Sequence, residues 1–253
     1  DQIFNNQSGS LLSNNQINIQ TTGLNNSQGQ IVAQQLLDIN AELEMLNNQN
    51  GLLSSDTVNV TSGVFNNDQG LVQAKTSLVL DTNGQNLVNT NSDAQGGLLS
   101  QGNLSLKNIG LLDNKLGYLA SGQNLDIGVN QVQNGNGTLL AAQNLKLQGI
   151  GQNQLLNNQS GQILSMGDMQ VSFEHINNQG KLTSTDTDSH IMAAGQLDIQ
   201  TQQLDNQNTK TLTDTDTSIQ GIDAGNLNLN AVTVNNQSGA IRSSQNAVLN
   251  INK

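Results

Sequence analysis

The sequence predicts an all-β fold, a right-handed parallel β-helix of about eleven coils that spans residues 1–253 as a single domain. Three observations lead to this prediction. Apolar clusters recur along the whole chain with a period close to 20 residues. Within each cluster apolar and polar residues alternate, which is the period of a half-buried strand. The chain also contains no proline, a residue that the interior of a hydrogen-bonded sheet excludes because it lacks an N–H group.

Each repeat opens with an apolar residue, two asparagines and then a glycine, and it closes with an alternating apolar pair. In the first copy Phe4, Asn5 and Asn6 lead to Gly9, and the copy closes with Ile17 and Ile19. The closing apolar position falls at residues 19, 39, 60, 80, 106, 127, 147, 171, 199, 229 and 251. The spacing between copies is therefore never below 20 residues, and insertions lengthen some copies.

Three apolar clusters in each copy predict a coil of three short strands. Such a coil cannot bury its apolar side alone, but stacked coils share a continuous core. About eleven coils at ~4.8 Å each would form a rod roughly 50 Å long. We expect the Asn-Asn pairs and the following glycine to occupy turns with left-handed φ. Asparagine side chains at the same turn of successive coils would hydrogen-bond to one another in ladders.

The composition excludes several other classes of protein. Asn and Gln make up about 29% of the chain, which is typical of disordered prion-like tracts, but the repeat and the absence of proline argue against disorder. The net charge is -11 and the eight basic residues are scattered, so neither nucleic acid nor an anionic membrane is an expected partner. No apolar run is long enough to insert in a membrane, and any export signal is expected upstream of residue 1.

The block from Leu156, Asn157 and Asn158 through Gly161 and Ile163, closing at Met169 and Val171, resembles the haemagglutinin repeat of large bacterial exoproteins secreted by two-partner systems. These are the filamentous haemagglutinin adhesins and the toxin-delivery proteins of contact-dependent growth inhibition. The pattern matches well in seven or eight of about eleven copies. Three copies depart from it, at residues 87–97, 177–180 and 204–206.

The resemblance implies a secreted, non-enzymatic filament segment at the bacterial cell surface, associated with the outer membrane. We expect a contact-dependent growth inhibition shaft that presents a toxin and binds an outer-membrane receptor on a neighbouring bacterium. The alternative is an adhesin that binds a host-cell surface molecule or glycan. In both cases a dedicated outer-membrane secretion partner would act through a domain outside this segment. No cofactor is expected.

Insertions near residues 81–97, 183–190 and 211–218 interrupt the regular repeat. The last two are rich in Ser, Thr and Asp, and Asp186 aligns with Asp216 when they are counted back from Gly195 and Gly225 respectively. We therefore expect two arms on neighbouring coils that together form a partner-contact surface, since insertions in a solenoid often carry binding. The candidate contact residues are Asp186, Asp188, His190, Asp214 and Asp216. The alternative is a pair of solvated acidic loops.

Metal binding and catalysis receive less support from the sequence. The alternating aspartates raise the possibility of calcium, but neither the EF-hand pattern nor the glycine-rich calcium nonapeptide is present. A β-helical polysaccharide-active enzyme is a minor alternative, for which Asp38, Asp126 and Asp198 would form an outward acidic stripe. A solvated strand face accounts for the same three residues. We expect no enzyme activity.

Overall fold

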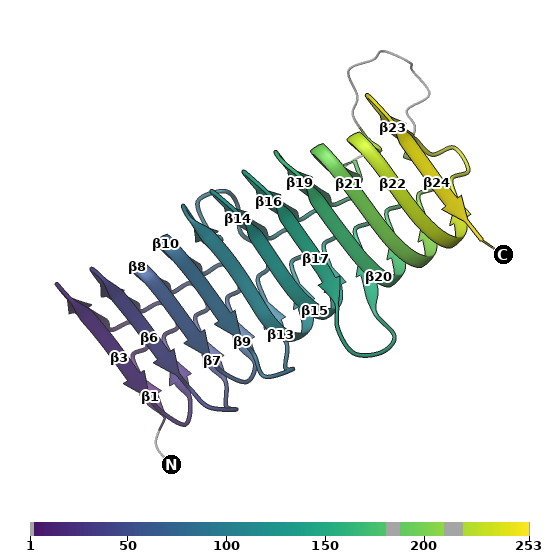
Figure 1. Ribbon diagram of the computed structural model, residues 1–253. Coiled ribbons are helices and arrows are strands. Elements are labelled where there is room, and N and C mark those ends of the chain that lie inside the picture. The colour runs from purple at the N-terminus through teal and green to yellow at the C-terminus, as the bar shows by residue number, and fades with distance from the viewer. Residues whose placement is uncertain (1–2, 181–187, 210–219, 253) are drawn as a thin grey trace.

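Short strands stacked along one axis make up the protein, and the chain winds through them as a solenoid with its termini at opposite ends (Figure 1). The structure is a computed structural model that describes residues 3–180, 188–209 and 220–252. Within these ranges every regular element is a strand. The strands are β1 (Phe4–Asn5), β2 (Ser10–Ser13), β3 (Gln16–Gln20), β4 (Leu24–Asn25), β5 (Gln30–Ala33), β6 (Leu36–Asn40), β7 (Leu46–Asn47), β8 (Leu52–Thr61), β9 (Phe65–Asn66), β10 (Leu71–Asp81), β11 (Leu87–Val88), β12 (Gly97–Ser100), β13 (Asn103–Asp113), β14 (Tyr118–Ser121), β15 (Leu125–Gln133), β16 (Thr138–Ala141), β17 (Leu145–Gly149), β18 (Leu155–Asn157), β19 (Gln162–Ser165), β20 (Met169–Asn177), β21 (His190–Asp205), β22 (Gly221–Asn235), β23 (Ile241–Ser243) and β24 (Ala247–Ile251).

Every strand pairing is parallel and joins equivalent positions of successive repeats. Phe4 pairs with Leu24, Leu24 with Leu46, and Leu46 with Phe65, at the first apolar position of each repeat. The second strand of each repeat continues the pattern, with Tyr118 opposite Thr138. The expected all-β fold of parallel strands is therefore confirmed.

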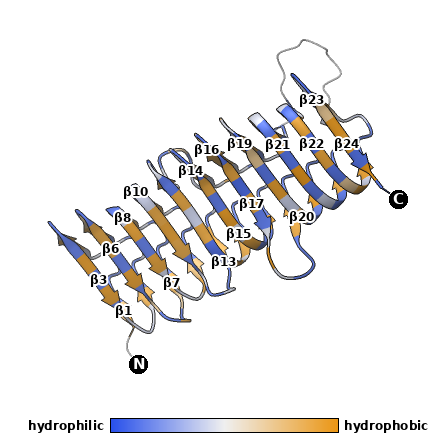
Figure 2. Ribbon diagram, viewed as in Figure 1, coloured by the Kyte–Doolittle hydropathy of each residue, from blue (hydrophilic) through white to orange (hydrophobic). Residues whose placement is uncertain are grey.

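Alternation along each strand places one set of side chains inside the solenoid. In the middle strands the inward column includes Ile31, Leu53, Val72, Leu98 and Leu119, all of them completely buried. Apolar and polar residues accordingly alternate in colour along the strands (Figure 2). Each fully buried Leu, Ile or Val contributes about 1.5–3 kcal/mol relative to an exposed one, so the stacked columns form the principal stabilising feature.

The insertion near residues 81–97 is two short loops separated by a strand in register. Strand β11 pairs with β9 through Leu87 and Phe65, and with β13 through Leu87 and Leu112. The first extra residues therefore lie before Leu87, and the second set lies between Asn89 and Gly97, which pairs with Leu71. The insertion lengthens two corners and leaves the stack intact.

Candidate functional site

A single file of asparagines, all of them buried except the last, Asn236, runs along the solenoid at the corner that follows the first strand of each repeat. It contains the second asparagine of each Asn-Asn pair, or the asparagine at the same register position. The side-chain amide of each one donates to the side-chain oxygen of the next, over 2.7–2.9 Å. The members of this asparagine ladder within the described residues are Asn6, Asn26, Asn48, Asn67, Asn89, Asn114, Asn134, Asn158, Asn178, Asn206 and Asn236.

The ladder also satisfies backbone groups in the interior of the corner. Asn114, which is completely buried, donates to the carbonyl oxygens of Gly117 at 3.4 Å and Thr138 at 3.2 Å, besides its bond to Asn134. Because a buried polar group without a partner costs about 1–3 kcal/mol, this arrangement makes asparagine difficult to replace. The expected amide ladder is thus present, and it lies inside the solenoid.

The glycine of each repeat is required because the ladder leaves no room for a side chain at that position. A Cβ atom on Gly137 would lie 2.0 Å from the carbonyl oxygen of Asn114 in the preceding repeat and 2.7 Å from Oδ1 of Asn134. A Cβ atom on Gly117 or Gly161 would meet the equivalent atoms, a carbonyl oxygen of the preceding ladder asparagine and Oδ1 of the next one. A side chain is excluded at these positions by contact with backbone atoms.

The expectation that the Asn-Asn pair and this glycine adopt left-handed φ is wrong. The left-handed residue is the one before the glycine, as in Gln28 with φ of 56°, Asn136 with 54° and Ser160 with 57°. The same position holds Leu116, with φ of 52°. Because Ser, Gln, Asn and Leu all occur there, no single residue type marks the position in the sequence.

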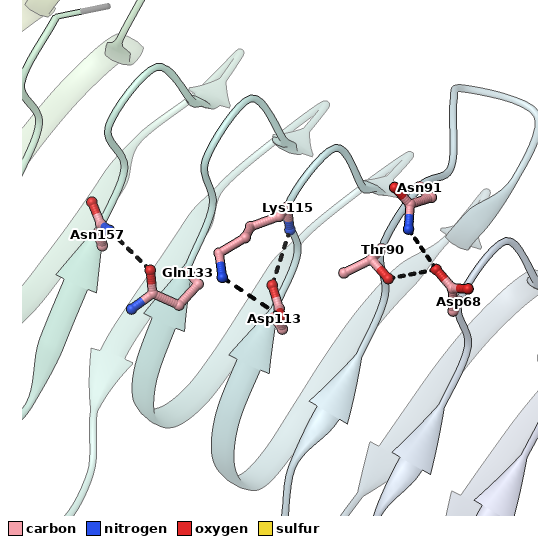
Figure 3. A network of polar contacts seen from close by, with 7 residues as sticks. All are labelled: Asp68, Thr90, Asn91, Asp113, Lys115, Gln133 and Asn157. Carbon is pink, nitrogen blue, oxygen red and sulfur yellow. Dashed lines mark hydrogen bonds and ion pairs between the residues drawn. The ribbon is translucent and has the colours of Figure 1, made fainter. Parts of the chain in front are cut away.

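Outside the ladder, a second set of polar contacts crosses from repeat to repeat on the surface of the same corner (Figure 3). Asn157 donates to Gln133 over 2.9 Å, and Lys115 lies 3.9 Å from the carboxylate of Asp113. Asp113, Gln133 and Asn157 each occupy the position just before the ladder asparagine of their repeat. Lys115 instead follows the ladder asparagine Asn114, and it contacts Asp113 of its own repeat. All of these surface residues are partly exposed, so their contribution to stability is smaller than that of the ladder.

Asp68 anchors the longer of the two loops in the 81–97 insertion. Its Oδ1 accepts hydrogen bonds from Thr90 and Asn91, each over 2.7 Å (Figure 3). Its Oδ2 accepts from Gln49 and Gln69. Burial alone would raise the pKa of Asp68, but these four hydrogen bonds together lower it. The sequence analysis did not identify this residue, because its partners come from three different repeats.

Three of the five proposed partner-contact residues lie outside the residues that the structure describes. These are Asp186, Asp214 and Asp216, and Asp188 is half-buried at the start of a described range. The residues that flank the two gaps occupy equivalent places in adjacent repeats, because the N–H of Gly221 donates to the carbonyl of Ser189. The described residues that follow the two insertions, His190 and Gly221, are paired and therefore lie at the same corner of adjacent repeats.

His190 belongs to the shaft. It is the first residue of β21 and pairs with Gln162 and Gly221 in the neighbouring repeats. Only 8% of its surface is exposed, and among the described atoms its Nε2 has no hydrogen-bond partner. Burial lowers the pKa of His190, with the negative charge of Asp223 opposing this effect and the positive charge of Arg242 adding to it. Its side chain is therefore poorly placed to contact a partner directly.

The acidic stripe considered from the sequence does not form. Asp38, Asp126 and Asp198 do share one outward column, but Asn59, Val79 and Ser105 separate the first two, and Lys146 pairs directly with Asp126. At ~4.8 Å per strand, Asp126 and Asp198 are about 14 Å apart. Glycosidase carboxylates lie about 5–9.5 Å apart. The three aspartates cannot act as a catalytic pair.

A metal site is likewise unsupported in the part of the chain that the structure describes, where no three His, Asp or Glu side chains gather to hold an ion. The same ranges contain no helix of the length and hydrophobicity that would let it cross a bilayer.

A solenoid of parallel strands closed over a continuous amide ladder is the architecture of an extended, fibrous repeat protein. The sequence model of the haemagglutinin repeat matches residues 1–43, 37–91, 81–149 and 150–201 of this chain. The chain therefore belongs to the haemagglutinin repeat family, whose members are secreted, surface-exposed adhesins of the filamentous haemagglutinin type. No curated protein and no solved structure gives a significant match. The ladder continues to Asn206 and Asn236, beyond the matched residues.

Proposed function

We propose that the chain is a non-enzymatic filament segment of a large secreted exoprotein, folded as a right-handed parallel β-helix of about eleven coils. Its role is to hold a contact or effector region at a distance from the cell surface. The asparagine ladder carries this proposal, because it passes without a break from Asn6 to Asn236 through all three insertions. A repeat protein that conserves its long-axis contacts through irregular loops is built for length and stiffness.

Deletion of one register-matched repeat tests the filament role. Residues 118–137 form such a unit, because Tyr118 and Thr138 are paired and Gly117 already accepts a hydrogen bond from the N–H of Thr138. Removal of these residues should shorten the rod by about 4.8 Å, measured by small-angle X-ray scattering, and leave a cooperative unfolding transition. Deletion of 118–127 is the control, because it brings unlike faces together and should abolish folding. Equal effects of the two deletions would contradict the proposal.

Toxin delivery to neighbouring bacteria is the finer function that we propose for this filament, with an outer-membrane receptor as its partner. It is supported by the pairing of His190 with Gly221, the described residues that follow the two insertions, at one corner of adjacent repeats, where the insertions could meet a receptor together. Secretion would depend on a dedicated outer-membrane partner that acts on another part of the exoprotein. Adhesion to a host-cell surface molecule is the competing function, and the family membership favours it.

A binding assay separates these two functions. Because Ser189 and His190 are buried in the shaft, the deletions should be limited to residues 183–187 and 211–218. The chain and the deletion variant would be incubated with outer-membrane vesicles of neighbouring bacteria and with host-cell membranes. Binding to the bacterial vesicles that disappears with the deletion supports toxin delivery. Binding to host membranes alone contradicts it, and binding that the deletion does not change contradicts the role of the insertions.

A further inference from the structure

One outward face of the solenoid carries an apolar stripe where solvated side chains would be expected. The residues are outward members of β12, β14, β16, β19 and β21, and successive ones are paired across the sheet. We call them the apolar face: Leu99, Ala120, Leu140, Leu164 and Met192. They span four strand spacings, about 19 Å. Next to them, Met166 has half of its surface exposed.

The face formed by the third strands of the same repeats is polar instead of apolar. There the equivalent outward column reads Ser105, Asp126, Lys146, Gln170 and Asp198. Because this column is polar in the same repeats, solvent exposure alone does not explain the apolar face. The five side chains are half-buried, and together with the exposed Met166 they form a contiguous apolar stripe at the surface. Contiguous apolar surface of this kind can serve as an interaction surface.

Four of the five side chains of the apolar face are large, and the small one, Ala120, lies one repeat from Leu140. A twofold axis through Leu140, parallel to the strands, would place two copies face to face with their long axes antiparallel. Leu164 of one copy then meets Ala120 of the other, one spacing on either side of Leu140. In the adjacent column, Met166 meets Gly122 by the same operation. A protruding side chain therefore faces a small one at each of these contacts.

A groove in the structure matches this arrangement. It has a volume of about 730 Å³ and lies along the apolar face between Ala94 of the 81–97 insertion and Leu140, with Leu99, Ala120 and Gly122 in its lining. The twofold operation directs Leu164, Met166 and Met192 of the second copy toward this groove. The lining of the groove also contains polar and charged side chains, among them Gln101, Asp56 and Lys75. The protruding half of the face thus faces a recess whose floor is apolar at Leu99 and Ala120 and polar farther along.

The charges beyond the two ends of the stripe are also complementary under the same twofold axis. Asp223 and Arg242 lie three and four spacings beyond Leu140 in one direction. Lys75 and Asp56 lie in the repeats that are three and four spacings away in the other direction. Within one copy Lys75 lies 3.8 Å from the carboxylate of Asp56, so these two residues form an ion pair at the surface. Antiparallel pairing brings Lys75 toward Asp223 and Asp56 toward Arg242 of the second copy. Parallel pairing would instead bring each charge toward its own copy, which is repulsive.

From this match of shape and charge we propose that the apolar face binds a second copy of this chain in an antiparallel, twofold-symmetric dimer. The nine repeats from Ser54 to Arg242 cover about 38 Å of length, and three outward columns cover about 13 Å of width. Each copy thus buries on the order of 500 Å², or roughly 1,000 Å² in total, which is the lower bound of specific interfaces. The dimer is expected to be weak and dependent on concentration.

Sedimentation equilibrium of the chain from micromolar to submillimolar concentration tests the proposal. The natural chain should pass from monomer to dimer in this range. Leu140→Asp should raise the dimer dissociation constant about 100-fold, because two carboxylates then meet on the twofold axis. Val79→Asp is the matched control, since Val79 is an outward, half-buried apolar residue on the other face, and it should leave the dimer unchanged. Circular dichroism melting of both variants checks that the fold is retained.

Charge reversal tests the antiparallel geometry. Lys75→Glu and Asp223→Lys should each weaken the dimer, and the double variant should restore it, because the two residues exchange signs across the interface. A chain that stays monomeric throughout, or a Leu140→Asp variant that dimerises normally, would overturn the proposal. Additive loss in the double variant would overturn the antiparallel arrangement.

Discussion

Asn134 donates a hydrogen bond from its side-chain amide to Oδ1 of Asn158 over 2.7 Å, although 24 residues separate them in the chain. Both side chains are completely buried. The contact repeats from one end of the described solenoid to the other. Because every rung donates in the same direction, the ladder gives the solenoid a polar axis, and each rung depends on those before and after it.

Removal of one rung should therefore be costly. Asn158 donates to Asn178, Gly161 and His190 and accepts from Asn134. Asn158→Ala removes four hydrogen bonds from a buried corner and takes away the amide that donates to the buried Oδ1 of Asn178, so the free energy of unfolding should fall by about 2–4 kcal/mol in a urea titration. The adjacent Asn157→Ala is the control. Asn157 is half-buried on the outside of the same corner, so its loss should cost about 1 kcal/mol. Similar losses for both would contradict the dominance of the inner ladder.

Two glycines of the same corner, Gly137 and Gly135, separate the steric role of glycine from its conformational flexibility. Gly137→Ala places a Cβ atom 2.0 Å from a backbone oxygen that cannot move without shifting the preceding repeat. We expect a loss of about 3 kcal/mol or more in the free energy of unfolding. In Gly135→Ala the nearest atom is 3.7 Å away and φ is not left-handed, so this variant should be neutral or more stable by about 0.4–1 kcal/mol. A harmless Gly137→Ala would mean that the corner is far looser than the structure indicates.

The repeat period and the inward columns were accessible from the sequence because both depend on the alternation of residue types. Ile163, predicted to point inward, is completely buried, while the neighbouring Gln162 is half-buried. The reason for the glycine that recurs in the repeats was not accessible. A glycine that avoids a clash and a glycine that adopts left-handed φ look the same in one sequence.

Of the five candidate contact residues, only Asp188 and His190 lie within the described residues. His190 was assigned to an arm because it ends a polar run in the sequence, but it is the first residue of strand β21. Asp38, Asp126 and Asp198 were correctly placed on one outward column. The distance between them, which follows from the number of repeats that separate them, was not considered. Asp68 was missed because its hydrogen bonds join residues about 20 positions apart.

Leu116 holds a strained conformation that substitution should relieve. It lies in the left-handed region with φ of 52°, it is 56% exposed, and the equivalent residue one repeat later is Asn136. Leu116→Asn should raise the free energy of unfolding by about 1 kcal/mol, because asparagine tolerates left-handed φ better than leucine. Leu12→Asn is the control, since Leu12 is 64% exposed within a strand of ordinary φ and should change stability little. No gain at Leu116 would show that its side chain makes a compensating contact.

Stability should depend on pH through His190. Because burial lowers the pKa of this histidine in the folded protein, the unfolded chain takes up a proton as the pH falls below about 6.5 and the folded chain does not. His190 thus favours folding above that pH, and this advantage is lost as the pH falls toward the lower pKa of the folded state. Urea titrations at pH 7 and pH 5 should show a smaller free energy of unfolding at the lower pH. His190→Gln should reduce the difference, whereas His175→Gln, at an exposed position, should preserve it. An unchanged pH dependence in His190→Gln would place its origin elsewhere, with the carboxylates such as Asp68 as the next groups to test.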